Sequence, residues 1–127
     1  MLRKIGFTVL CVAASISTAA HSISTHSLQP GLTLEYDLPP NDPQMFVNYM
    51  FWSVEANCKI TTKDASDELY AEVIVKKATV NGSELSQGQS IKLTVAQGQN
   101  LKIAADSGAK VKITNLGKSL VKATCSS

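Results

Sequence analysis

The feature that most constrains the fold is a cadence of about ten residues in the C-terminal half of the chain. It is marked by four glycines, Gly88, Gly98, Gly108 and Gly117. Each segment of the cadence places a lysine between two apolar residues, as in Ile91-Lys92-Leu93, Leu101-Lys102-Ile103, Val111-Lys112-Ile113 and Val121-Lys122-Ala123. This alternation predicts short strands with apolar side chains inside and lysines outside, and glycine suits the turns between them.

Two β folds repeat in this manner, an antiparallel sandwich and a parallel β-helix. A β-helix would stack Lys92, Lys102 and Lys112 on one another, and opposed like charges destabilise a sheet. The repeating unit is also too short for one coil of such a helix. We therefore expect an all-β fold, a small antiparallel β-sandwich of about seven to nine short strands, with a meander of hairpins in its C-terminal half.

The segments before the cadence fit the same fold class. Alternation predicts a strand over 32–36, and three prolines make Leu38–Gln44 a loop. A further strand is expected over Leu69–Lys77. Asn81-Gly82 then predicts a tight hairpin turn.

The longest apolar stretch, Met45–Thr62, predicts one long strand. Its second half alternates between apolar and polar residues, whereas its first half is apolar on both faces. Val47, Tyr49 and Phe51 share one of these faces, and Trp52 falls on the side that faces inward. A strand that is apolar on both faces is either covered twice or exposed for binding.

The N-terminal residues have the pattern of a secretory signal peptide. Arg3 and Lys4 provide a positive start, an apolar run follows over 5–16, and small residues lead up to Ala20. The apolar run is too short to span a bilayer, so we expect cleavage rather than the alternative, an uncleaved anchor, and no transmembrane span. The expected organisation of this exported, bacterial product is a signal peptide over 1–20, a flexible lead-in over 21–30 and one domain over 31–127.

Two cysteines remain after cleavage, Cys58 and Cys125. In an exported domain such a pair predicts one disulfide bond, and both residues continue an inward-facing series of side chains. The alternative, a two-cysteine metal site, lacks a histidine or further cysteine nearby. We therefore expect a Cys58–Cys125 disulfide.

Charge is divided unevenly along the chain. Residues 21–72 hold two lysines and eight acidic residues, whereas residues 73–127 hold eight lysines and two acidic residues. The sum over 21–127 is zero, and no arginine follows the leader. Proteins that bind nucleic acids need a basic surplus and arginine side chains, so we expect no nucleic-acid partner.

Two surfaces are candidate binding sites. The first is the aromatic face formed by Val47, Tyr49 and Phe51, with a hydrophobic core as the alternative interpretation. The second is a basic face formed by Lys92, Lys102, Lys112 and Lys122. That face suits an acidic partner, and its alternative is an ordinary solvated strand surface that complements the acidic first half.

Histidine is the commonest general base, but His21 and His26 both precede the first predicted strand. If cleavage exposes His21 as the N-terminus, its amine and imidazole resemble the histidine brace of copper proteins. Those proteins also need a second histidine from the sandwich, and this chain has only His26, five residues away. Asp64, Asp67 and Glu68 cluster in a polar turn, where solvated carboxylates are expected. The sequence thus predicts no catalytic constellation and no cofactor.

These patterns predict a non-enzymatic protein that acts in the periplasm or outside the cell. We expect it to bind a protein or a glycan through the aromatic face. A second hypothesis is an inhibitor of a lysozyme-like or other extracellular enzyme, with Leu38–Gln44 as a loop that enters the enzyme's cleft. A third is copper binding through His21.

Overall fold

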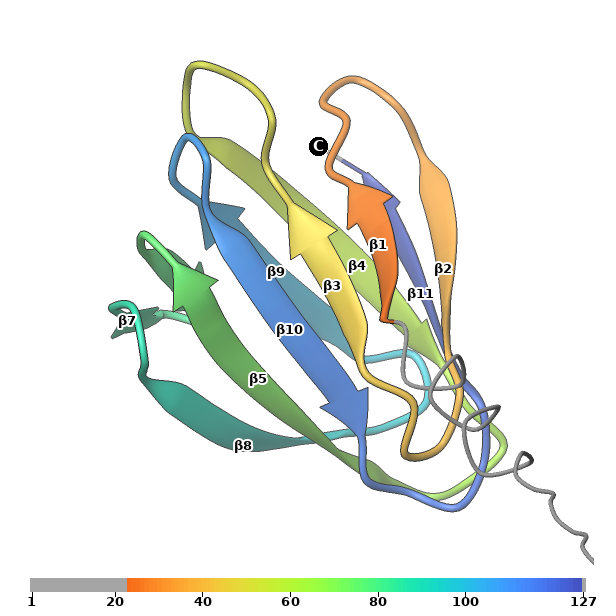
Figure 1. The fold of residues 1–127 in the computed structure, drawn as a ribbon. Coiled ribbons are helices and arrows are strands. Elements are labelled where there is room, and N and C mark those ends of the chain that lie inside the picture. The colour runs from red at the N-terminus through yellow and green to blue at the C-terminus, as the bar shows by residue number, and fades with distance from the viewer. Residues whose placement is uncertain (1–22, 127) are drawn as a thin grey trace, which may run out of the picture.

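The computed structural model describes residues 23–126, which form eleven strands in two sheets packed face to face (Figure 1). The strands are β1 (Ser24–Ser27), β2 (Leu34–Leu38), β3 (Gln44–Val47), β4 (Val54–Thr61), β5 (Asp67–Val75), β6 (Ala78–Val80), β7 (Ser83–Leu85), β8 (Ser90–Val95), β9 (Asn100–Ala105), β10 (Lys110–Asn115) and β11 (Val121–Ser126). The predicted all-β sandwich is therefore confirmed. The strand number exceeds the prediction because several strands are only three or four residues long.

The first sheet has the strand order β1-β3-β10-β5-β8, and the second has the order β2-β11-β4-β9-β6-β7. Neighbouring strands are antiparallel except β1 and β3, which run parallel. Residues 23–126 contain no helix with the length and hydrophobicity that a bilayer crossing demands.

The predicted meander of the C-terminal half is wrong. Strands β8, β9, β10 and β11 alternate between the sheets, so that β8 and β10 flank β5 while β9 and β11 flank β4. Among the described strands, β6 and β7 are the one consecutive pair that forms a hairpin, at the predicted Asn81-Gly82 turn. Alternation marks a buried face, which every strand of a sandwich has, so it cannot distinguish a hairpin from a crossing between sheets.

Three of the four turns of the cadence, those at Gly88, Gly98 and Gly108, share one geometry. In each, the fourth residue donates its N–H to the carbonyl of the first at 2.9–3.0 Å, over Ser86–Gln89, Ala96–Gln99 and Asp106–Ala109. Glycine is third, with φ +80° at Gly98, as a type II turn requires. Gly98 donates its N–H to the Ile60 carbonyl, and the Gln99 carbonyl accepts the Ile60 N–H. Two consecutive residues therefore pair with the single residue Ile60 on the neighbouring strand, as in a β-bulge.

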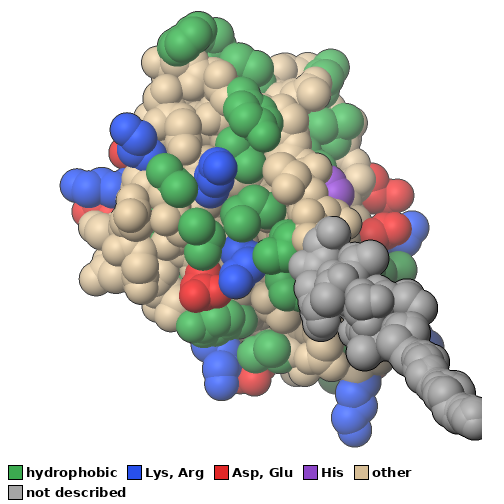
Figure 2. All heavy atoms as spheres, viewed as in Figure 1, with side chains coloured by type: hydrophobic (Ala, Val, Ile, Leu, Met, Phe, Trp, Pro, Cys, Tyr) green, Lys and Arg blue, Asp and Glu red, His purple; other side chains and the backbone are tan. Residues whose placement is uncertain are grey.

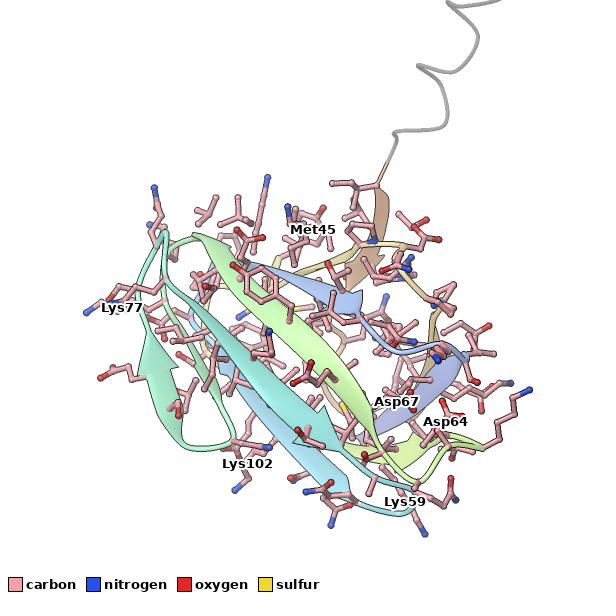
Figure 3. The ribbon with its side chains drawn as sticks, turned by 90° about the horizontal axis from the view of Figure 1, so that it is seen from below. Met45, Lys59, Asp64, Asp67, Lys77 and Lys102 are labelled. Atoms are coloured by element: carbon pink, nitrogen blue, oxygen red, sulfur yellow. A yellow bond between two sulfur atoms is a disulfide. The ribbon has the colours of Figure 1, made fainter. Side chains whose placement is uncertain are left out.

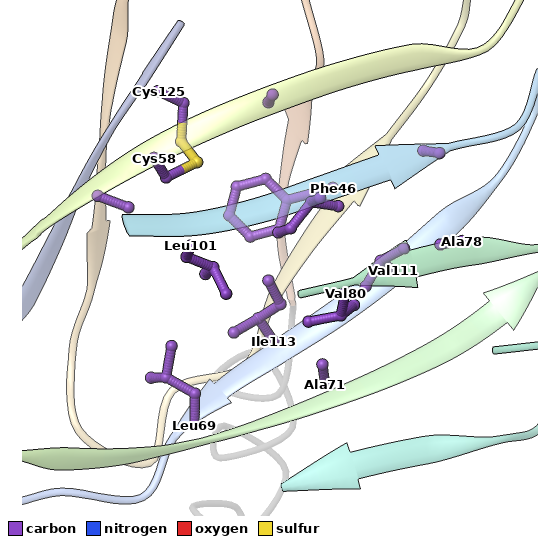
Figure 4. Packing of buried hydrophobic residues seen from close by; sticks show 14 of the residues in the cluster. Phe46, Cys58, Leu69, Ala71, Ala78, Val80, Leu101, Val111, Ile113 and Cys125 are labelled. Carbon is purple, nitrogen blue, oxygen red and sulfur yellow. A yellow bond between two sulfur atoms is a disulfide. The ribbon is translucent and has the colours of Figure 1, made fainter. Parts of the chain in front are cut away.

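The core lies between the two sheets and consists of the inward residues of each strand (Figure 4). In β4 burial alternates strictly, which confirms the prediction for the second half of the apolar stretch. Cys58 and Cys125 face each other across β4 and β11, with their Cα atoms 3.9 Å apart, and form the predicted disulfide. All eleven strands and this core lie within residues 24–126, so this part of the chain supplies its own hydrophobic interior.

The N-terminal part of the described chain differs from the predicted flexible lead-in. Ser24–Ser27 forms β1, which adds to the edge of the first sheet beside β3. An edge strand is half solvated, so its polar side chains do not oppose strand formation. The predicted signal peptide lies outside the described residues.

Candidate functional site

The apolar stretch that predicted one strand is divided by a loop. β3 ends at Val47, β4 begins at Val54, and the chain between them passes from the first sheet to the second. The predicted shared face is therefore wrong, since Val47 is only 2% exposed while Tyr49 and Phe51 lie in the loop. Trp52 was expected to face inward and does not, because strand parity does not continue through a loop.

The side chains of this loop form the largest group of exposed apolar residues at this end of the sandwich. Tyr49 is 62% exposed, Trp52 is 57% exposed and Phe51 is 94% exposed. Figure 2 shows hydrophobic side chains at the upper end of the molecule, where Figure 1 places the β3–β4 loop. We call residues 49–52 the aromatic loop. A cluster of exposed apolar side chains indicates an interaction site, whereas exposed apolar residues that are scattered singly are normal on a protein surface.

A buried asparagine immediately before the aromatic loop fixes its backbone. The Asn48 side chain is wholly buried. Its Nδ2 donates to the carbonyl oxygens of Trp52 at 2.9 Å, Ala105 at 3.0 Å and Asp106 at 3.1 Å. Its Oδ1 accepts the backbone N–H of Met50 at 2.8 Å, which closes an Asx turn. One side chain therefore ties the loop to itself and to the end of β9.

The β9–β10 turn holds the loop from the other side. The backbone of Asn48 donates to the Ala109 carbonyl at 3.0 Å and accepts the Gly108 N–H at 2.9 Å. The Ser107 hydroxyl donates to the Met50 carbonyl at 2.7 Å. The aromatic side chains are thus displayed from a backbone that is already ordered, which lowers the entropy lost on binding.

The same construction occurs at the opposite end of the sandwich. Asn115 is also wholly buried and ends β10. Its Nδ2 donates to the carbonyls of Ser119 and Leu38, each at 2.8 Å, and its Oδ1 accepts the N–H of Gly117 at 2.8 Å. We call residues 116–120 the twin loop.

The two anchored loops belong to an internal repeat. The pattern Asn-x5-Val-x-Ala-x-Cys occupies 48–58 and recurs, 67 residues later, at 115–125. Sequence reasoning noticed the Val, Ala and Cys positions but missed Asn48 and Asn115. The shared spacing of asparagine and cysteine is the signal that could have found them.

The repeat is matched by the geometry of the sheets. Met45 pairs with Lys112 in the first sheet and Cys58 pairs with Cys125 in the second, and both pairs have the offset of the repeat. A pseudo-twofold axis through these two pairs therefore exchanges β3 with β10 and β4 with β11. It also exchanges the aromatic loop with the twin loop.

The side chains of the two loops differ although their anchoring is the same. Residues 49–52 are Tyr-Met-Phe-Trp, whereas the equivalent residues 116–119 are Leu-Gly-Lys-Ser. The crossing between sheets is therefore built without aromatic residues at one end. It follows that the fold does not require Tyr49, Phe51 or Trp52, and their exposure calls for another explanation.

A shallow hollow of about 260 Å³ lies beside the aromatic loop. It is lined by Val47, Asn48, Tyr49, Met50, Phe51, Ser107, Gly108 and Lys110. Its wall is largely apolar, and Lys110 is the one charged residue of its lining. The arrangement suits a ligand with an apolar part and a negative charge.

The predicted basic face does not form. Lys92 and Lys112 belong to the first sheet, whereas Lys102 and Lys122 belong to the second, because successive strands alternate between sheets. Three of them lie near carboxylates: Lys112 Nζ is 3.3 Å from Glu72, Lys102 Nζ is 4.0 Å from Glu55, and Lys122 Nζ is 3.6 Å from Glu35. The alternative interpretation, solvated strand faces that complement the acidic first half, describes them better.

His26 lies in a strand rather than in a loose tail. Its Nε2 is 2.8 Å from the Gln44 Oε1, and its ring stacks on Phe46 and meets the edge of Tyr36. Burial raises the pKa of the Tyr36 hydroxyl above its ordinary value. His21, the residue on which the copper hypothesis depends, lies outside the described residues.

The carboxylates of the β4–β5 turn are only partly solvated. Figure 3, which views the sandwich from below, shows Asp64 and Asp67 close together. Asp67 is buried and accepts the Thr62 hydroxyl at 2.6 Å, and it leaves no room for a side chain at Gly117. Burial raises the pKa of the Asp67 carboxyl, and Asp64 raises that pKa further. These contacts join the turn to the twin loop, which is a structural role.

The proline-rich loop Leu38–Gln44 is tied to the body of the protein. Asn41 donates its N–H to the Asn115 carbonyl at 2.7 Å, and all three prolines are half-buried. These contacts hold the base of the loop, while Asn41 and Asp42 at its tip are exposed.

Within residues 23–126, no three His, Cys, Asp or Glu side chains are grouped so that they could hold a metal ion. No protein family matches this chain, and no curated protein or solved structure is significantly similar to it.

Proposed function

We propose that this protein is a non-enzymatic binding protein that attaches to a macromolecular partner through the aromatic loop. The observation that carries the proposal is the 94% exposure of Phe51 on a backbone anchored by Asn48. The twin loop supports it, because the same anchoring there carries no aromatic side chain. Exposed aromatic residues on an ordered backbone give a large contact area at low entropic cost, as interface hot spots do.

The chemistry around the loop supports binding rather than catalysis. The hollow is lined by apolar side chains, serine, glycine, the fully hydrogen-bonded Asn48 and one lysine. Such groups provide contact area and one charge. Acid–base or nucleophilic catalysis needs a base within hydrogen-bond reach of a reacting group, and this lining offers no such pair.

The proposed place of action is outside the cytoplasm. The leader over residues 1–20 has the composition of a secretory signal, and the Cys58–Cys125 disulfide is a bond that persists in oxidising compartments. Mass spectrometry of the exported protein tests this part. We expect a chain that begins near residue 21 and whose mass is lower by two hydrogen atoms because of the disulfide.

The binding role is tested with residues 21–127, using membranes, cell-wall polysaccharide and exported proteins from the producing cell as three separate fractions. We expect one fraction to retain the protein. Phe51→Ser should weaken retention about tenfold or more, as loss of a hot spot does. The triple variant Y49L/F51S/W52S should abolish it, since it replaces Tyr49 and Trp52 by their twin-loop equivalents and Phe51 by an uncharged polar residue.

Leu120→Ser is the matched control, because Leu120 is an exposed apolar residue of the twin loop. It should bind like the wild type. Both loop variants should keep the wild-type melting temperature within a few degrees, because the Asn48 hydrogen bonds are to backbone atoms. Retention that does not depend on Phe51, or no retention by any fraction, would refute the proposed function.

A further inference from the structure

We propose that the partner of the aromatic loop is the surface of an anionic lipid bilayer. In this arrangement Tyr49, Phe51 and Trp52 enter the headgroup region, and lysines around the loop contact lipid phosphates. The inference rests on the proposed function and names the chemistry of the partner.

Three lysines lie at the same end of the sandwich as the aromatic loop, one beside the loop and two beside the neighbouring β9–β10 turn. Lys110 borders the hollow beside Tyr49 and Phe51. The backbone carbonyl of Lys77 accepts the N–H of Asp106 at 3.1 Å. The side chain of Lys76 lies beside Gly108 in the β9–β10 turn, where its Cε is 3.8 Å from the position that a Cβ atom on Gly108 would occupy. Within residues 23–126 none of the three is in an ion pair, in contrast to three of the strand lysines.

Acidic groups at this end are few or already paired. The aromatic loop has no acidic residue, and Asp106 accepts a long hydrogen bond of 3.5 Å from the Ser53 hydroxyl. Glu35 and Glu55, near the same end, each lie within 4.0 Å of a lysine of the neighbouring strand. The free charge around the loop is therefore mainly positive, and it complements a negative membrane surface.

The side chains themselves suit a bilayer interface. Tyrosine and tryptophan combine an apolar ring with a polar group and concentrate at the headgroup level of membranes, while phenylalanine favours the apolar side of that boundary. An apolar surface beside basic residues is the general pattern of proteins that lie in the interface. A glycan, by contrast, needs side-chain hydrogen bonds beside the rings, and the Asn48 amide of this site is used internally.

The single tryptophan of the chain makes the inference directly measurable, because its fluorescence reports on the aromatic loop alone. Residues 21–127 are used, since the apolar leader would itself enter lipid. They are mixed with vesicles of phosphatidylcholine, with or without about one-third phosphatidylglycerol. We expect a blue shift of Trp52 emission and its quenching by acyl-brominated lipid, mainly with the anionic vesicles and less at high salt.

Variants separate the two parts of the site. Phe51→Ser should reduce the vesicle-bound fraction at least tenfold in sedimentation, and K76Q/K77Q/K110Q should remove the preference for anionic lipid. Leu120→Ser and Lys118→Gln alter the twin loop in the same chemical ways and should change neither value. Each variant is compared only after its melting temperature matches that of the wild type.

The outcomes distinguish this inference from the proposed function. An unshifted Trp52 spectrum with anionic vesicles, or a bound fraction that Phe51→Ser leaves unchanged, would overturn the bilayer inference. If the polysaccharide or protein fraction nevertheless retains the chain through Phe51, the proposed function stands with a different partner. Equal binding to neutral and anionic vesicles would remove the role assigned to the lysines and overturn the anionic part.

Discussion

Asn48 shows how much of this structure depends on single buried amides. Its side chain satisfies backbone groups in three segments: its own loop, the end of β9 and the turn that follows β9. A buried backbone group without a partner is costly, and an asparagine supplies both a donor and an acceptor in the space of a small side chain. Asn115 does the same at the other end.

Replacing Asn48 by alanine should therefore destabilise the whole domain. The Met50 N–H loses its acceptor and buried carbonyls lose their donor, which together should cost about 3 kcal/mol of the free energy of unfolding. Urea denaturation measures this loss. Asn57→Ala is the control, because Asn57 is exposed on β4 and should change stability by less than about 0.5 kcal/mol. A loss at Asn48 as small as at Asn57 would show that the amide is not an anchor.

At the scale of the elements, the ten-residue cadence is a strand plus a turn that changes sheets. The turn connects one strand to the next. Its glycine also donates its N–H to another part of the backbone, as Gly98 does to the Ile60 carbonyl of β4. This double use, which Gly88, Gly98 and Gly108 share, explains why these three glycines are spaced by a constant ten residues. An insertion would move the glycine out of register with its partner.

Gly98→Ala tests the turn without creating a clash, because the space around Gly98 is open. Its φ of +80° is unfavourable for any residue with a Cβ, so alanine should cost about 1–2 kcal/mol in urea denaturation. Gly98→Asn should cost less, since asparagine tolerates this region of backbone space. If alanine and asparagine cost the same or nothing, backbone conformation is not the reason for glycine here.

The elements also show what could be predicted from the sequence. Alternation identified β4 and the strands of the cadence, and Asn81-Gly82 identified the hairpin between β6 and β7. Both signals are local. Alternation depends only on a single strand having one buried face, and the hairpin turn depends only on two residues that adopt positive φ. The assignment of strands to sheets is not local, and there the predicted meander and basic face failed.

The candidate site was found only in part for a related reason. Tyr49 and Phe51 were singled out, but the apolar run around them has high strand propensity and does not show where β3 ends. The end is set by Asn48, whose partners in β9 and in the turn after it lie more than fifty residues away. A polar residue inside an apolar run was the available clue.

At the scale of the whole molecule, the pseudo-twofold axis and the disulfide coincide. The bond joins β4 and β11, which lie side by side in the second sheet, and it closes a loop over a separation of 67 residues. Covalent closure of a loop this long restricts the unfolded chain considerably. The disulfide thus links the two repeats at their symmetric position.

Removing the disulfide should destabilise the domain without changing its fold. The loop length predicts a loss of about 4 kcal/mol for the variant C58A/C125A, or for the wild type under reducing conditions. Urea denaturation with and without reductant measures it, and circular dichroism should still show a β-sheet spectrum. Identical midpoints in both conditions would mean that the two sulfur atoms are not bonded in the protein.

The anchoring of each loop through backbone atoms has a practical consequence. Because Asn48 and Asn115 bond only to main-chain carbonyls and amides, the exposed side chains of the two loops can vary while the sandwich stays the same, with Gly117 as the exception. The two tips point away from each other at opposite poles (Figure 1). The domain is thus a natural display scaffold, on which two unrelated peptides could be grafted to bridge two targets.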